Sequence, residues 1–177
     1  MFFGVSSAAT RSNMDIVSSD EFIDMLTEKG SKLSWYFIYM PVGKEPDVNM
    51  MLTPEQRIEL GRRVRHIRTE KPYFAIDFFN DAPYVGGCIA GGRRYLHINA
   101  AGDVEPCVFI HYSNANIHDV SLLDALRSPL FMKYYEGQPF NDNYLKPCPM
   151  LENPDVLPKM VAETGATSTD LVEKETP

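Results

Sequence analysis

The chain has 177 residues, of which 44% are hydrophobic and 23% are charged, so it is long and apolar enough to bury a core. Its net charge of −7 argues against broad nucleic-acid affinity, because phosphate binding depends on clustered Lys and Arg. No run approaches the roughly 18 apolar residues of a membrane span, and the first residues lack the pattern of a signal peptide. We therefore expect a cytoplasmic protein that binds neither nucleic acid nor membrane.

The first 80 residues alternate between apolar runs and helical patterns. The runs that predict strands cover residues 2–5, 35–43 and 73–80. The last two are so continuously apolar that we expect strands buried on both faces, as in a parallel sheet. The order strand, helix, strand, helix, strand is typical of parallel βαβ units, which place functional residues at the carboxyl ends of the strands.

Two capping patterns predict where the intervening helices begin. Ser18 with Glu21 predicts a capping box for the first helix. Thr53 with Gln56, and Pro54 in the first turn, gives the second helix a clear start.

Beyond residue 80 the pattern changes to that of a hairpin. Residues 93–99 alternate between polar and apolar, Gly102 supplies positive φ in a turn, and Val104 begins a returning strand. Two short helices are expected next, one capped by Ser121 and one starting at Pro129. The end of the chain is polar and is expected to be disordered. The predicted domains are therefore 1–80, 81–158 and a tail at 159–177.

The three cysteines are the residues with the most specific chemistry. Cys88 and Cys107 flank the predicted hairpin, and Cys148 follows the helices in a Pro-Cys-Pro context. Because a hairpin returns its ends to the same edge, Cys88 and Cys107 can converge there, and a segment folding back would bring Cys148 to them. An odd count excludes a fully paired disulfide framework, so the thiols are either inert or ligands of a soft metal centre.

The spacing Cys88-x13-Gly102-x4-Cys107, followed by a helix and Cys148, resembles the twitch/SPASM region of radical S-adenosylmethionine (SAM) enzymes. The segments FFGVSSAATRSN, WYFIYMPVG and YFAIDFFND are similar to the closing strands of the partial (β/α) barrel that precedes such a region. The resemblance implies an α/β fold, in which the last βα units of the barrel are followed by a β-hairpin plus helix region. It also implies that the three cysteines bind an auxiliary 4Fe–4S cluster.

Two departures limit what the resemblance implies. The hallmark Cys-x3-Cys-x2-Cys motif is absent from this sequence, so the chain is expected not to cleave SAM alone, and whether it is part of an enzyme stays open. A start at Met1 in a mid-barrel strand suggests a truncated product, a split gene or an artificial fragment. A fourth cluster ligand is also not evident. It is Glu152, Asp155 or His111, or else the fourth iron is open to substrate.

Further expectations follow from the resemblance. Relatives contact SAM near the positions of Ser6, Thr10, Arg11 and Asn13, and SAM would bind here only if the missing N-terminal half completed the site. The competing interpretation of these four residues is loop polarity and helix capping. The predicted partners are that missing half or a second copy, joined through an open barrel edge.

Two alternatives to the cluster remain open. In one, a metal-free interaction module retains the fold and binds a partner through its open edge. In the other, zinc occupies the cysteines with one histidine, although structural zinc ligands usually come in close pairs that this sequence lacks.

Overall fold

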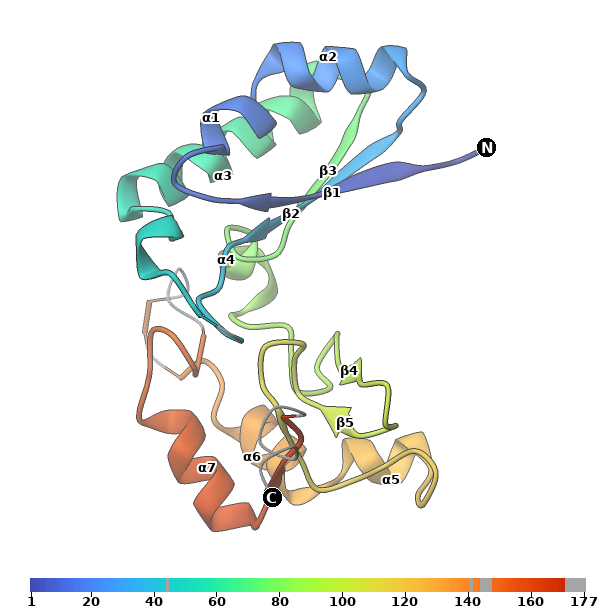
Figure 1. Cartoon of the computed structure of the whole chain (residues 1–177), viewed down its shortest axis with the longest axis vertical. Coiled ribbons are helices and arrows are strands. Elements are labelled where there is room, and N and C mark those ends of the chain that lie inside the picture. The colour runs from blue at the N-terminus through green and yellow to red at the C-terminus, as the bar shows by residue number, and fades with distance from the viewer. Residues whose placement is uncertain (44, 141, 144–147, 171–177) are drawn as a thin grey trace. The chain divides into compact units, whose positions relative to one another are not determined.

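The computed structural model describes residues 1–43, 45–140, 142–143 and 148–170, and the chain divides into two compact units (Figure 1). Unit 1 is Met1–Asp81 and unit 2 is Ala82–Pro177. In the described part of the chain, no helix has the length and apolar character needed to cross a membrane.

Unit 1 is built on a three-stranded parallel sheet. Its elements in chain order are β1 Gly4–Ala9, α1 Met14–Val17, α2 Asp20–Glu28, β2 Leu33–Ile38, the short 3-10 helix η1 Val48–Met50, α3 Pro54–Glu70 and β3 Phe74–Asp77. The strand order is β1-β2-β3, with Gly4 opposite Leu33 and Leu33 opposite Phe74. Each strand therefore reaches its parallel neighbour through helical connections, which confirms the predicted α/β class and parallel sheet.

The helices of unit 1 cover one face of this sheet (Figure 1). On that face Ser34, Tyr36 and Ile38 of β2 are buried, and the Tyr36 hydroxyl donates a 2.8 Å hydrogen bond to the Val17 carbonyl at the end of α1. Burial raises the pKa of Tyr36 to about 12, so this hydroxyl keeps its hydrogen. The core of unit 1 lies between this face and the helices.

The prediction that both faces of these strands are buried is wrong. Along β2 burial alternates, and Trp35 and Phe37 on the second face are only half-buried, with stacked rings 5.0 Å apart. On the same face of β3, Phe74 is 60% exposed. Aromatic residues on both faces of a strand give a continuous apolar run, whether or not a second layer covers them.

The capping predictions had different outcomes. Thr53 and Gln56 form the predicted box, with both reciprocal hydrogen bonds present. The cap of α2, however, is Ser19, whose hydroxyl accepts from the amide of Phe22, so the prediction of Ser18 is wrong. Ser18 is buried and donates instead to the Met14 carbonyl, because it closes the last turn of α1.

Unit 2 combines short helices with two small antiparallel sheets. Its elements are α4 Ala82–Val85, β4 His97–Ile98, β5 Val104–Glu105, β6 Tyr112–Ser113, α5 Leu122–Leu126, α6 Pro129–Glu136, α7 Val156–Thr164 and β7 Thr167–Ser168. The pairing of β4 with β5 confirms the predicted hairpin, with His97 opposite Glu105. Ser121 caps α5 and Pro129 begins α6, as predicted.

The prediction of a disordered tail over 159–177 is wrong for residues 159–170. Helix α7 continues to Thr164 and buries Leu157 and Met160 in the core of unit 2. Strand β7 then pairs with β6, with Tyr112 opposite Ser168. The polar composition was misleading, because main-chain pairing with β6 orders this segment whatever its side chains are. Residues 171–177 lie outside the described part of the chain.

Candidate metal centre

The three cysteines of unit 2 lie in one neighbourhood although they come from three separate segments. Cys88 follows α4, Cys107 follows β5, and Cys148 precedes α7. All three are unpaired thiols of intermediate exposure, and Cys88 and Cys107 pack against the core. The pKa of Cys107 is raised mainly by burial, and negative charge on Cys88 or on Cys148 raises it further, so the three sulfurs are within electrostatic reach of one another.

Main-chain hydrogen bonds hold the first two cysteine segments together. The amide of Gly91 donates to the carbonyl of Pro106 at 2.9 Å, which joins the loop after Cys88 to the residue before Cys107. The Arg93 guanidinium donates to the carbonyls of Val85, Gly86 and Cys88. These bonds fix the backbone around Cys88. Convergence of Cys88 and Cys107 at one edge of the hairpin requires such a fixed backbone.

Glycine is required where this loop approaches α5 and α6. Gly91 and Gly92 have φ of +66° and +78°, a region that residues with side chains rarely adopt. A Cβ atom on Gly91 would lie 2.2 Å from Cδ1 of Tyr134, and one on Gly92 would lie 2.6 Å from Cδ2 of Leu126. The glycines therefore let the cysteine loop lie directly against the side chains of Tyr134 and Leu126.

The metal-free thiols are strongly biased toward their neutral form. Burial raises the pKa of Cys107 to about 12 and that of Cys148 to about 11, and it also raises the pKa of Cys88. The effect on Cys88 is opposed by a hydrogen bond with Tyr134 and by the positive charge of Arg93. Since metals bind thiolates, a metal entering this site would have to displace these protons.

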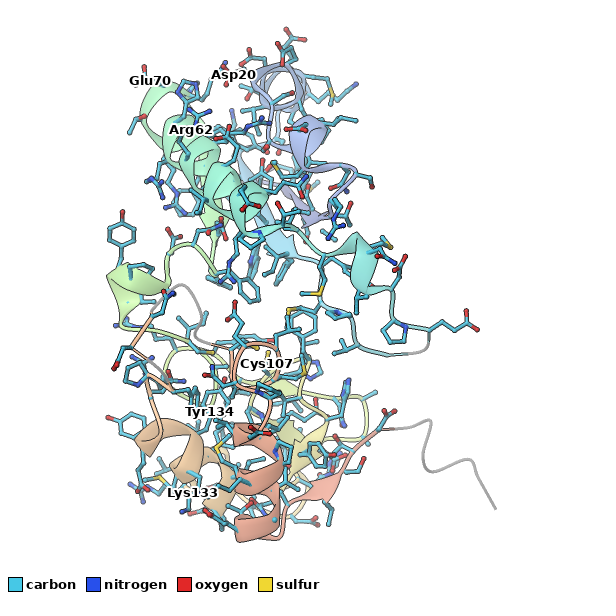
Figure 2. The ribbon with its side chains drawn as sticks, turned by 90° about the vertical axis from the view of Figure 1, so that its left-hand side faces the viewer. Asp20, Arg62, Glu70, Cys107, Lys133 and Tyr134 are labelled. Atoms are coloured by element: carbon cyan, nitrogen blue, oxygen red, sulfur yellow. The ribbon has the colours of Figure 1, made fainter. Side chains whose placement is uncertain are left out.

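Two polar side chains from the α6 region approach Cys88. The Tyr134 hydroxyl lies 3.0 Å from the Cys88 sulfur, and Tyr134 is 1% exposed. Figure 2 shows Tyr134 and Cys107 in the same part of unit 2. The Gln138 carboxamide also acts on Cys88, yet its nitrogen and oxygen are buried with no well-formed hydrogen bond to any described residue. A buried amide of this kind is costly unless a group other than the described residues satisfies it.

The third cysteine sits in its own tight turn. The Cys148 amide donates to a carboxylate oxygen of Glu152 at 3.2 Å, and the Asn153 side chain donates to the Cys148 carbonyl at 2.9 Å. Among the predicted fourth ligands, Glu152 is therefore beside a cysteine, whereas His111 lies 3.7 Å from Glu105 and Asp155 precedes α7.

The predicted SAM-side residues lie in unit 1 and are engaged in local bonds. Ser6 is an exposed residue within β1, and the other three follow the carboxyl end of that strand. The amide of Thr10 donates to the Asn13 side chain at 2.8 Å, and Arg11 donates to the Met51 carbonyl at 3.1 Å. These bonds match the competing interpretation of loop polarity, and a SAM role stays a prediction.

Sequence reasoning missed a buried carboxylate next to Cys107. Glu105 is fully buried, and its Oε2 lies 2.7 Å from Nδ1 of His97. Its other oxygen accepts from the hydroxyl of Thr169 and from the Asn99 amide. The available signal was the hairpin register, because it places His97 directly opposite Glu105.

The described side chains do not gather around one point as the ligands of a single ion do. Among the residues that the structure describes, no three His, Cys, Asp or Glu side chains gather closely enough to hold one ion. Zinc draws its sulfur ligands to about 2.3 Å, so they crowd around a single point. An iron–sulfur cluster makes a different demand, because its ligands attach to different iron atoms.

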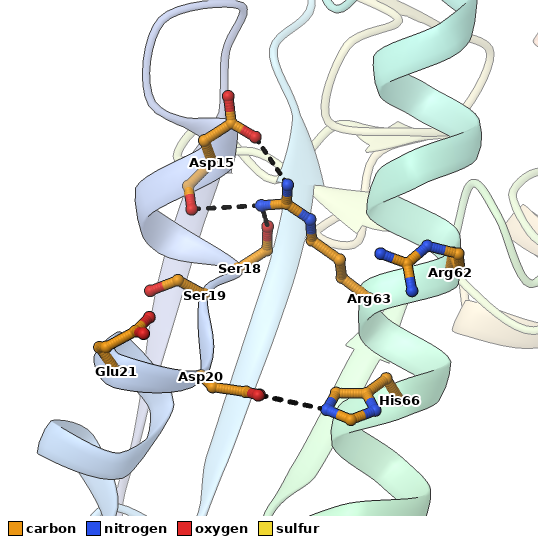
Figure 3. A pocket seen from close by; sticks show the side chains of 8 residues that line it. All are labelled: Asp15, Ser18, Ser19, Asp20, Glu21, Arg62, Arg63 and His66. Carbon is orange, nitrogen blue, oxygen red and sulfur yellow. Dashed lines mark hydrogen bonds and ion pairs between the residues drawn. The ribbon is translucent and has the colours of Figure 1, made fainter.

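A hollow in unit 1 offers no comparable site. It lies between α1, α2 and α3 and is lined by acidic and basic side chains (Figure 3). Arg63 pairs with Asp15 at 2.8 Å, and His66 lies 3.3 Å from Asp20. Two of its three acidic side chains are thereby paired within the wall.

Comparison with known proteins bears on the cysteine site. Residues 88–150 match a family model for an iron–sulfur cluster-binding domain. The matching model is that of the SPASM family, and the match is consistent with the SPASM/twitch region of a radical SAM protein. Comparisons with curated proteins and with solved structures gave no match.

Proposed function

We propose that Cys88, Cys107 and Cys148 together bind one 4Fe–4S cluster, as the auxiliary site in the C-terminal part of a radical SAM/SPASM-domain protein. The observation that carries the proposal is the extent of the family match. It begins at Cys88 and ends two residues beyond Cys148, so it contains the three thiols that lie within electrostatic reach of one another.

The residues present fit such a group on two grounds. Cysteine thiolates are the usual ligands of an iron–sulfur cluster, and the three thiols, with no disulfide between them, can fill three of its usual four positions. The buried Gln138 carboxamide, unsatisfied within the described chain, is a hydrogen-bond donor beside one of those thiols. The positive charge of Arg93 near Cys88 further favours a thiolate at that position.

When bound, the cluster would supply one-electron transfer or an iron with an open coordination position. The chain's contribution is to hold three thiolates in place. The backbone of Cys88 is fixed by the hydrogen bond from the Arg93 guanidinium to its carbonyl. The backbone of Cys148 is fixed by its hydrogen bonds with the side chains of Glu152 and Asn153. The fourth position is met by a side chain of this protein, for which Glu152 is a candidate because it contacts Cys148, or by substrate.

Competence for SAM cleavage is proposed to require another polypeptide segment. The sequence contains three cysteines, all used in the proposed auxiliary site, so none remains for a SAM-cleaving cluster. The parallel β1-β2-β3 order with helices on one face supports the interpretation of unit 1 as a part of a (β/α) barrel. Strand β1 is an edge of the described sheet, and the exposed residue Phe2 precedes it. An unpaired edge of this kind supports a partner strand that pairs there.

Anaerobic reconstitution with iron and sulfide tests the proposal. The wild-type protein should become brown and bind about four irons per chain, as one cubane requires. Cys88→Ala, Cys107→Ala and Cys148→Ala should each lose most of that iron, whereas His118→Ala, which alters an exposed histidine, should retain it.

Two results would count against the proposal. Undiminished iron in the cysteine variants would show that the metal binds elsewhere. Protein purified without reconstitution could instead contain one zinc per chain. If that zinc is not displaced by added iron and sulfide, the result would favour the zinc-bound alternative.

A further inference from the structure

Tyr134 is a polar side chain at the cysteine site to which the ligand set gives no role. It comes from α6 and is 1% exposed, with its hydroxyl 3.0 Å from the Cys88 sulfur. Charge on any of the three cysteines acts on this phenol, so it lies near all of them. Because the Tyr134 side chain is packed on all sides, its hydroxyl oxygen has little freedom to move.

The surrounding residues hold the ring and therefore aim the hydroxyl. On one side Gly91 leaves room only because it has no Cβ, which would meet three atoms of Tyr134 within 2.9 Å. On another side Phe140 packs edge-on, with ring centroids 5.1 Å apart and planes at 84°. The hydroxyl cannot turn away from Cys88 without disturbing this packing.

Binding of iron would fix the direction of this hydrogen bond. In the metal-free protein either the thiol or the phenol can be the donor. A metal-bound cysteine is a thiolate with no hydrogen, so only the phenol can then donate. We propose that Tyr134 donates its hydrogen to the Cys88 sulfur of the bound cluster and thereby raises the reduction potential of that cluster.

This inference rests on the proposed function and follows from electrostatics. Reduction adds one electron to the cluster and makes or breaks no bond, and the phenol keeps its hydrogen throughout. The added negative charge is stabilised by a donor aimed at a ligand sulfur, and more strongly in a buried site of low dielectric than in water. The reduced form thus gains more from Tyr134 than the oxidised form does.

A potential measurement on Tyr134→Phe tests the role of the hydroxyl. The variant keeps the ring, so iron content should match the wild type while the hydrogen bond is lost. In an anaerobic titration with dithionite as the electron donor, followed by electron paramagnetic resonance, its potential should be more negative than that of the wild type. Tyr135→Phe, which alters an exposed neighbour on the same helix, should leave the potential unchanged. Equal potentials for Tyr134→Phe and the wild type would overturn the inference.

A second variant covers the case in which Tyr134→Phe does not retain iron. Replacing Tyr134 with 3-fluorotyrosine keeps the hydroxyl and makes it a stronger acid and donor, so the potential should rise above the wild-type value. An unchanged or lower potential would overturn the inference. The two proposals fail differently: wild-type protein that takes up no iron overturns both, whereas loaded protein insensitive to Tyr134 overturns only this one.

Discussion

The contact between Gly91 and Tyr134 predicts that Gly91→Ala destabilises unit 2. Two costs arise at this position. The backbone has φ of +66°, and the new Cβ would lie 2.2 Å from Cδ1 and 2.5 Å from Cγ of the Tyr134 ring. Such distances are far inside van der Waals contact, and the ring is buried in the core with Leu130 and Leu157.

The expected size of the effect can be worked out from these two costs. A residue with a side chain pays about 1–2 kcal/mol for left-handed backbone. Forcing one extra carbon into a packed core costs about 1–3 kcal/mol more. Gly91→Ala should therefore lower the free energy of unfolding by about 2–5 kcal/mol, a large part of the roughly 5–15 kcal/mol typical of a folded domain.

Gly165→Ala is a matched control within the same unit. Gly165 has φ of +63°, nearly the value of Gly91, but no atom lies within 4 Å of its hypothetical Cβ. Gly165→Ala should therefore lower the free energy of unfolding by the backbone cost alone, about 1–2 kcal/mol, without the clash. The difference between the two variants therefore isolates the contact with Tyr134.

Urea unfolding followed by far-UV circular dichroism is a suitable assay. The single tryptophan is Trp35 in unit 1, so its fluorescence does not report directly on unit 2. Hydrogen exchange of peptides covering α6 adds a local measurement of the same loss. If Gly91→Ala loses no more stability than Gly165→Ala, the reasoning about the close approach is refuted.

Two other changes test charges outside the ligand set. Glu105→Ala should cost about 3–5 kcal/mol, because it leaves buried partners such as His97 and Thr169 unpaired; a thermal-melting loss below about 1 kcal/mol would contradict this. Hydrogen bonds from the guanidinium groups of Arg62 and Arg63 lower the pKa of Glu59 from 4.5 to about 2. Its stabilisation is therefore present above pH 4.5 and is lost as the pH falls toward 2. Because these ion pairs are solvent-accessible, Glu59→Gln should lower the free energy of unfolding by less than about 1 kcal/mol at neutral pH. The free energy of unfolding of the variant should also fall less steeply than that of the wild type between pH 4.5 and pH 2. Equal slopes in this range would argue against the pairing.

Local features of the sequence determined much of the outline. The Thr53 box, the Ser121 cap and the hairpin around Gly102 were predicted because each depends on residues a few positions apart. The spacing between Cys88 and Cys107 also indicated an iron–sulfur region, because it resembles that of SPASM proteins, and the family match covers both positions.

Only the tertiary structure decided the surroundings of the cysteines. Tyr134 meets Cys88 across 46 residues of sequence, and Thr169 meets Glu105 across 64 residues. No local pattern encodes such meetings, because they depend on how α6 and the β6–β7 pair pack on the hairpin. The sequence by itself therefore determined which thiols are available for metal, whereas the fold decided which hydrogen-bond donors face their sulfurs.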